Sequence, residues 1–568
     1  MNSIRSSSTF ATLALTALLL AACGKQAAPD NALPLAFAPA DTPYAFANLE
    51  PTPAPVLAAQ SQTMQLVWPA VFARYDALLN DAEALPERPK KIARALLDEL
   101  RTRDSHEKLR EIGIKPDARF AFYGVGLVPV ARVELGDPAA FKAMIARVEA
   151  KVGEKMPTGK TGTQEYWQLG NEHIAFILAI ENTHLVASVW APDASDAVKQ
   201  TLLGLSRPAQ SLADSGKLQA IAKQYGYAPY GEGYFDAIAL VQRLSSAPTG
   251  SDLEIAKSMH LPSEGAITDA VCKSEILGIA QNFPRVVFGA EKIEPHKATV
   301  GMQLELAPAL AKSLSEALTP APGGDASSDA LVDFSIALPL LKLKDFWIRQ
   351  AEAVASKPYA CASLAGLNKS FADSKSKLDR TIPPPFSDLT GARITLSKFN
   401  ARGAGGVPDV GGKLLIGSSN PLAAIGMAQL AMPALKDVKI TTDGNPVAVP
   451  AGVAPAAVPP LAIAVNDKAI AIAAGKGEDA GLHDFLVAPA AATPTVMHMH
   501  FSGAIYGAMS HYAELLKASL PAAKRDQAEQ QQQLFAVYEK FLRSIDIRIE
   551  TNAQGIAMHE VVETGAAP

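Results

Sequence analysis

The chain has few aromatic residues, no excess of basic charge and no long apolar run beyond its first 25 residues. Aromatic residues make up 6% of the 568, which does not suggest a carbohydrate-stacking groove. With 52 basic and 57 acidic residues the formal net charge is −5, and the absence of a basic stripe argues against a nucleic-acid partner. No later segment has the roughly 18 apolar residues that a second membrane span needs.

Motifs of catalytic and nucleotide-binding sites are also missing. The sequence has no GxSxG elbow and no HExxH pair. The segment from Gly153 to Thr161, GEKMPTGKT, looks like a phosphate loop, but five residues separate Gly153 from Gly159 where that loop has four. We therefore expect no nucleotide, no cofactor and no enzymatic activity.

The only metal candidates are two histidines on a predicted strand. His498 and His500 alternate, so their side chains share one face, and His511 follows on the next predicted helix. Three imidazoles could bind zinc and leave a position open for water, as in a metal-dependent hydrolase. No carboxylate stands at a telling spacing, however. We favour the alternative that His498 and His500 are polar residues on the solvated face of the strand.

The N-terminus, MNSIRSSSTFATLALTALLLAACGK, has the pattern of a secretory signal, with Arg5 ahead of a short apolar region. Its end, Leu20-Ala21-Ala22-Cys23, resembles the lipobox of bacterial lipoproteins. The resemblance implies cleavage before Cys23 and acylation of that cysteine, which would anchor the chain to a membrane outside the cytoplasm. Gly24, where an Asp would favour the inner membrane, implies the outer membrane, and we expect its periplasmic face. The alternative is an uncleaved signal anchor.

Two cysteines remain once Cys23 is assigned to lipid. Cys272 and Cys361 are an even pair in an oxidising compartment, and both lie in segments predicted to be helical. We predict a disulfide between them, which would close a loop of about 90 residues and join the two halves of the chain. The alternative is two separately buried thiols.

The two halves of the chain carry the same patterns in the same order. Asp137-Pro138 and Asn420-Pro421 each follow a predicted strand and begin a predicted helix. Five segment pairs match in order at comparable spacing, which chance does not preserve. The pairs are 42–51 with 331–340, 129–148 with 412–431, 172–204 with 459–486, 231–244 with 495–509, and 284–306 with 543–563.

These patterns predict an α+β fold of two tandem similar domains, each a mostly antiparallel sheet covered by helices. Pro- and Gly-rich breaks set the boundaries. We expect a signal peptide at 1–22, the lipidated cysteine and a flexible tether at 23–41, the first repeat at 42–318, a linker at 319–330 and the second repeat at 331–568. The layout resembles uncharacterised bacterial envelope proteins with a duplicated α/β domain of unknown function. That resemblance supplies no catalytic residues.

Three functions remain open at this stage. The first is a non-enzymatic lipoprotein that binds an envelope protein or scaffolds an assembly. The second is a carrier or sensor of lipid or another amphiphile, which an apolar cavity in one or both domains would favour. The third is a metal-dependent hydrolase built around His498 and His500.

Overall fold

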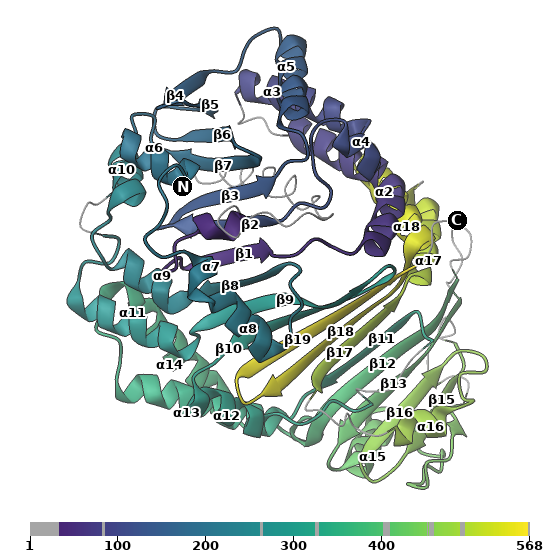
Figure 1. Cartoon of the computed structure of the whole chain (residues 1–568). Coiled ribbons are helices and arrows are strands. Elements are labelled where there is room, and N and C mark those ends of the chain that lie inside the picture. The colour runs from purple at the N-terminus through teal and green to yellow at the C-terminus, as the bar shows by residue number, and fades with distance from the viewer. Residues whose placement is uncertain are drawn as a thin grey trace. The chain divides into compact units, whose positions relative to one another are not determined.

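The computed structural model describes residues 33–81, 86–261, 265–323, 329–400, 409–450, 453, 459–488, 495–517 and 519–565 (Figure 1). The chain forms two compact units, the first ending at Gly301 and the second beginning at Met302. No helix in these ranges is long and apolar enough to span a bilayer.

Unit one is built on an antiparallel sheet with the strand order β4-β5-β6-β7-β3-β2-β1-β8-β9. Its strands are β1 Tyr44–Asn48, β2 Phe120–Val125, β3 Val128–Glu134, β4 Thr158–Thr161, β5 Gln164–Gly170, β6 Ala175–Glu181, β7 His184–Trp190, β8 Glu232–Asp236 and β9 Arg285–Glu294. The break between the units falls within β10, Lys297–Glu305.

Helices pack on both faces of this sheet. One face carries the 3-10 helix η2 Pro34–Phe37, α6 Asp196–Leu203, α7 Leu212–Ser215 and α8 Lys217–Tyr225, whose apolar residues share one core with the strands. The other face carries α2 Ala54–Asp81, α3 Glu87–Arg101 and α5 Pro138–Val152, with α3 and α5 side by side (Figure 1). The remaining helices of the unit are α4 His106–Arg110, α9 Ala237–Leu244, α10 Gly250–Ser258 and α11 Ala270–Asn282.

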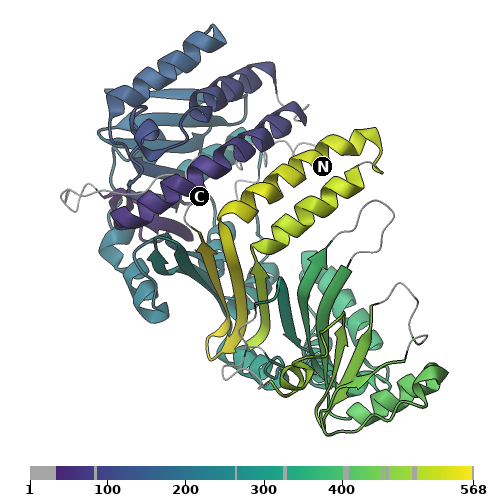
Figure 2. The same ribbon diagram turned by 90° about the vertical axis from the view of Figure 1, so that its right-hand side faces the viewer.

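Unit two has the strand order β14-β15-β16-β13-β12-β11-β17-β18-β19, again antiparallel. Its strands are β11 Val332–Ala337, β12 Leu389–Asn400, β13 Asp409–Ser418, β14 Val447–Ala448, β15 Leu461–Val465, β16 Ala469–Ala474, β17 Thr495–Ser502, β18 Leu542–Asn552 and β19 Gly555–Thr564. Its helices are α12 Pro308–Ala317, α13 Leu340–Ser356, η3 Ala362–Leu364, α14 Ala365–Leu378, η4 Phe386–Asp388, α15 Pro421–Ala431, η5 Pro433–Leu435, α16 Leu482–Val487, α17 Ala504–Lys517 and α18 Ala522–Phe541. Figure 2 shows α17 and α18 side by side.

Local signals in the sequence place several elements correctly. Asp137 caps α5, its carboxylate accepting from the backbone N–H groups of Ala139 and Ala140 at 2.8 and 3.1 Å. Asn420 caps α15 in the same way, accepting from the N–H of Ala423 at 3.2 Å. Side-chain oxygens at this position satisfy N–H groups that have no partner within the helix.

The helices together with the antiparallel strand pairings in both units confirm the predicted α+β class.

The predicted tether at 23–41 is wrong at its C-terminal end. Leu35 and Phe37 are 4% and 6% exposed and belong to the core of unit one. The guanidinium groups of Arg132 and Arg207 each lie 3.5 Å from the centre of the Phe37 ring. The Pro- and Ala-rich composition of the segment did not indicate this packing. Two large apolar side chains are nevertheless enough to fix a short segment on a core.

The segment 319–330, which was predicted to be the linker, is not the boundary between the two units. Its described residues belong to unit two, because the chain enters that unit already within β10. Gln303 of β10 and Asn552 of β18 exchange side-chain hydrogen bonds of 3.3 and 2.8 Å, and the N–H of Leu306 donates to the carbonyl of Gln554. These contacts fix the chain before the Pro- and Gly-rich segment begins.

The structure joins Cys272 and Cys361 in a disulfide, as predicted. Cys272 lies in the first turn of α11, where its N–H donates to the side chain of Asp269. Cys361 is not helical as expected, but extended, directly before η3.

Candidate functional site

The two candidate histidines converge on one carboxylate. His498 and His500 share a face of β17, as predicted, and Asp546 lies on the neighbouring strand β18. Nδ1 of His500 is 2.8 Å from Oδ1 of Asp546, and Nε2 of His498 is 3.7 Å from the same oxygen. The sequence did not reveal Asp546, because a cross-strand partner has no fixed spacing along the chain. Cys23 lies outside the described residues.

The prediction that these histidines face solvent is wrong for His498, which is only 5% exposed. It stands opposite Ser335 of β11, and His500 stands opposite Asp333 of the same strand. Ser335 and Asp333 are both fully buried. The polar face of β11 and β17 is therefore the covered face of this sheet.

The charges of the cluster support one another. The hydrogen bond that His500 donates to the carboxylate of Asp546 raises the pKa of His500, and the charges of Asp546 and Asp333 add to that effect. Burial by itself raises the pKa of Asp546, but hydrogen bonds from His498 and His500 outweigh it and the pKa is lowered. The arrangement favours an ionised carboxylate beside a protonated imidazole.

Next to this cluster lies a buried ion pair. Nε and Nη2 of Arg393, on β12, donate to the two carboxylate oxygens of Asp333 at 3.0 and 2.6 Å. The Arg393 guanidinium also lies 4.8 Å from the ring centre of Phe485 in α16. Two parallel hydrogen bonds to one carboxylate hold both partners in a fixed geometry.

A metal site is not assembled around the histidines within the described residues. His511 is exposed on α17. No three His, Cys, Asp or Glu side chains in the described part of the chain form a group that could hold a metal ion.

The opposite face of the same strands is apolar and only partly covered. We call it the apolar face of unit two. None of its side chains is buried, and Ile394 is 50% exposed. Antiparallel register brings them together in three neighbouring rows across β12, β11, β17 and β18. Its residues are Val332, Phe334, Ile336, Ile394, Leu396, Met497, Met499, Phe501, Ile545, Ile547 and Ile549.

Helix α17 contributes an apolar stripe beside this face. The ring of Tyr512 packs edge-on against Phe399 of β12, with 5.6 Å between ring centres. Met509, Tyr512 and Leu516 follow one another at helical spacing and are 40%, 38% and 41% exposed. The helix therefore presents apolar side chains at the edge of the apolar face of unit two.

Unit one has a comparable face on β1, β2, β8 and β9, which we call the aromatic face of unit one. Phe46 packs against Phe120 and Phe288 with ring centres 5.2 and 5.7 Å apart, and Tyr44 stacks on Phe122. These five rings are all partly exposed, and Phe235 beside them is 41% exposed. A low aromatic content overall did not predict six aromatic rings on one face.

Comparisons of the chain with protein-family models, with curated proteins and with solved structures found no match.

Proposed function

We propose that this protein is a lipid-anchored, non-enzymatic binding protein of the bacterial outer membrane that holds the apolar part of an amphiphile on its exposed sheet faces. The observation that carries the proposal is the apolar face of unit two, whose eleven side chains are all partly exposed. A contiguous exposed apolar patch marks a binding surface. The lipobox at Cys23 supplies the anchor and a periplasmic location at the membrane.

The proposal includes a duplication of one α+β unit. In unit one the strands follow the order β5-β6-β7-β3-β2-β1-β8-β9, and in unit two the order β14-β15-β16-β13-β12-β11-β17-β18. The sequence-matched segments supply six of these eight pairs, β6 with β15, β7 with β16, β3 with β13, β1 with β11, β8 with β17 and β9 with β18, and they occur in the same order in both series. The aromatic face of unit one and the apolar face of unit two then fall on corresponding strands, which supports two related binding surfaces.

An acyl chain suits these faces better than a protein partner does. Their side chains are aliphatic, Met or aromatic, with no charged residue among those named. A typical protein interface carries about one hydrogen bond per 100–200 Å², which these side chains do not provide. A scaffold that binds an envelope protein remains the second candidate, because exposed Trp347 and Phe386, 52% and 59% exposed, lie on other elements of unit two.

The test is binding of a fluorescent fatty acid to the purified chain that starts at residue 24. Ile394→Glu places a charge in the apolar face of unit two, and we expect at least a tenfold loss of affinity for that unit, about 1.4 kcal/mol. Asn400→Glu, exposed on the same strand, is the matched control and should change affinity less than twofold. Circular dichroism verifies that both variants fold.

Two results would argue against the proposal. One is an intact affinity in Ile394→Glu together with an intact affinity in Phe334→Glu. The other is purification from native membranes of a stoichiometric protein partner with no bound lipid, which would favour the scaffold.

A further inference from the structure

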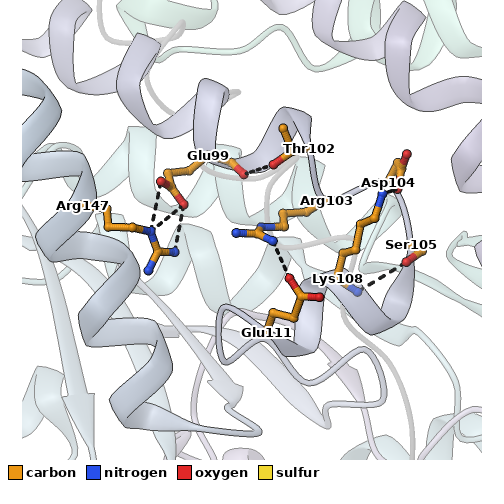
Figure 3. A network of polar contacts seen from close by, with 8 residues as sticks. All are labelled: Glu99, Thr102, Arg103, Asp104, Ser105, Lys108, Glu111 and Arg147. Carbon is orange, nitrogen blue, oxygen red and sulfur yellow. Dashed lines mark hydrogen bonds and ion pairs between the residues drawn. The ribbon is translucent and has the colours of Figure 1, made fainter.

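Helices α5 and α15 occupy corresponding places in the chain but differ in the side that faces away from the core. The outward side of α5 carries charges, and Nη2 of Arg147 lies 2.9 Å from Oε2 of Glu99 in α3 (Figure 3). Lys151 of α5 also forms an ion pair with Asp98 of α3. The apolar side of α5, with Phe141 and Met144, is buried in the core that α3 shares.

Helix α15 has no charged residue, and none occurs from Pro421 to Leu435. Ile425 is 7% exposed and packs with Val465 and Ile470 in a small core of unit two. Gln429 is the polar residue of the helix, and its amide donates to the carbonyl groups of Leu435 and Val438. Large apolar side chains of the helix, and that of Met432 directly after it, are exposed. Leu422, Met427, Leu430 and Met432 are 54%, 45%, 77% and 40% exposed.

We propose that α15 together with η5 lies on the surface of a lipid bilayer and inserts these exposed side chains among the acyl chains. An exposed Leu or Met gains roughly 1.5–3 kcal/mol when it is fully removed from water, so several together give a substantial driving force. Eleven residues are too few to cross a bilayer, so the helix lies in the plane of the interface.

The residues that follow α15 favour a lipid surface over a second copy of the chain. Lys436 and Lys439 are exposed directly after η5, with exposed Asp437 between them. Lysine stems extend along apolar surface while their ammonium groups reach lipid phosphates. The inference rests on the proposed place of this protein at a membrane, because the lipobox brings the chain to that surface.

The test is sedimentation of the chain that starts at residue 24 with vesicles of phosphatidylethanolamine and phosphatidylglycerol. This chain lacks Cys23, so binding does not depend on an acyl anchor. The double substitution Met427→Ser and Leu430→Ser should lower the vesicle partition coefficient at least tenfold. The matched control, Leu205→Ser with Met259→Ser, removes side chains of unit one that are 42% and 45% exposed and should change it less than twofold.

A second variant keeps the test decisive if the serine variant fails to fold. Leu430→Trp should show a blue-shifted emission on vesicle binding and quenching by brominated lipids. Unquenched emission would overturn the inference, as would equal vesicle binding by the serine variant and its control. A concentration-dependent dimer that the serine variant abolishes would assign the patch to a second copy instead.

The two tests distinguish a failure of this inference from a failure of the proposed function. If α15 does not bind vesicles while Ile394→Glu still weakens fatty-acid binding, the inference fails and the proposed function stands. If α15 binds vesicles while Ile394→Glu leaves fatty-acid binding unchanged, the chain contacts a bilayer through α15 and the apolar face of unit two has another ligand.

Discussion

Strands β1 and β11 are both interior strands of their sheets, and their buried side chains have opposite chemistry. Strand β1 lies between β2 and β8 and buries Ala45 and Ala47. Strand β11 lies between β12 and β17 and buries Asp333 and Ser335, both 0% exposed. An interior strand thus accepts either apolar or charged buried side chains, provided that each buried charge finds a partner, as Asp333 does in Arg393.

A single carboxylate breaks that condition in unit one. Glu232 of β8 stands opposite Ala47 of β1. It is 1% exposed, and its Oε2 has no hydrogen-bond partner within the described residues. Burial raises the pKa of Glu232 to about 7. Other buried charges of unit one are paired, Arg132 with Glu181 and Glu134 with Lys115 and Arg119, so Glu232 differs from them and from Asp333 in having no ion-pair partner among the described residues.

The largest expected effect comes from breaking the pair in unit two. Asp333→Ala leaves the Arg393 guanidinium buried without its carboxylate, and we expect a loss of about 3–5 kcal/mol in the free energy of unfolding. Urea unfolding followed by circular dichroism measures it. The double variant Asp333→Ala with Arg393→Met removes both charges and should recover most of the loss. A loss below about 1 kcal/mol in the single variant would mean that the pair is not buried as described.

The next effect concerns the unpaired carboxylate of unit one. A folded-state pKa raised above the unfolded value of about 4.5 gives stability that is present below that pH and lost as the pH rises through about 7. Wild type should therefore lose about 3 kcal/mol relative to Glu232→Gln between pH 4.5 and 8. Exposed Glu50→Gln is the control and should follow wild type. Parallel pH profiles for wild type and Glu232→Gln would contradict this expectation.

The smallest effect is expected at the histidine cluster. The lowered pKa of Asp546 gives stability that is lost as the pH falls below its unfolded value, and the raised pKa of His500 gives stability that is lost as the pH rises through it. Asp546→Asn should therefore cost most at about pH 5.5. The Asp546 side chain is 36% exposed, so solvent screening limits the cost to about 1 kcal/mol. Urea unfolding at pH 5.5 and pH 8 compares the two, and an equal cost at both would remove the electrostatic explanation.

Local chemistry explains what could be predicted from the sequence. The helix starts at Pro138 and Pro421 follow from the Asp and Asn residues that cap them. His498 and His500 share a face because strand side chains alternate. Their partner Asp546 comes from 46 residues further along the chain, and no local rule gives that contact.

The sequence by itself determined the helix starts at Pro138 and Pro421, the order of the matched segments in each half and the alternation of polar and apolar side chains on β11, β17 and β18. Only the tertiary structure decided which of those two faces is covered. Polar and apolar residues that alternate along a strand show that its two faces differ, but they do not show which face packs inward. The usual expectation that the apolar face packs inward is wrong for these strands. In unit two ion pairs and hydrogen bonds satisfy much of the covered polar face, because side chains from separate strands meet there, and the apolar face is left partly exposed.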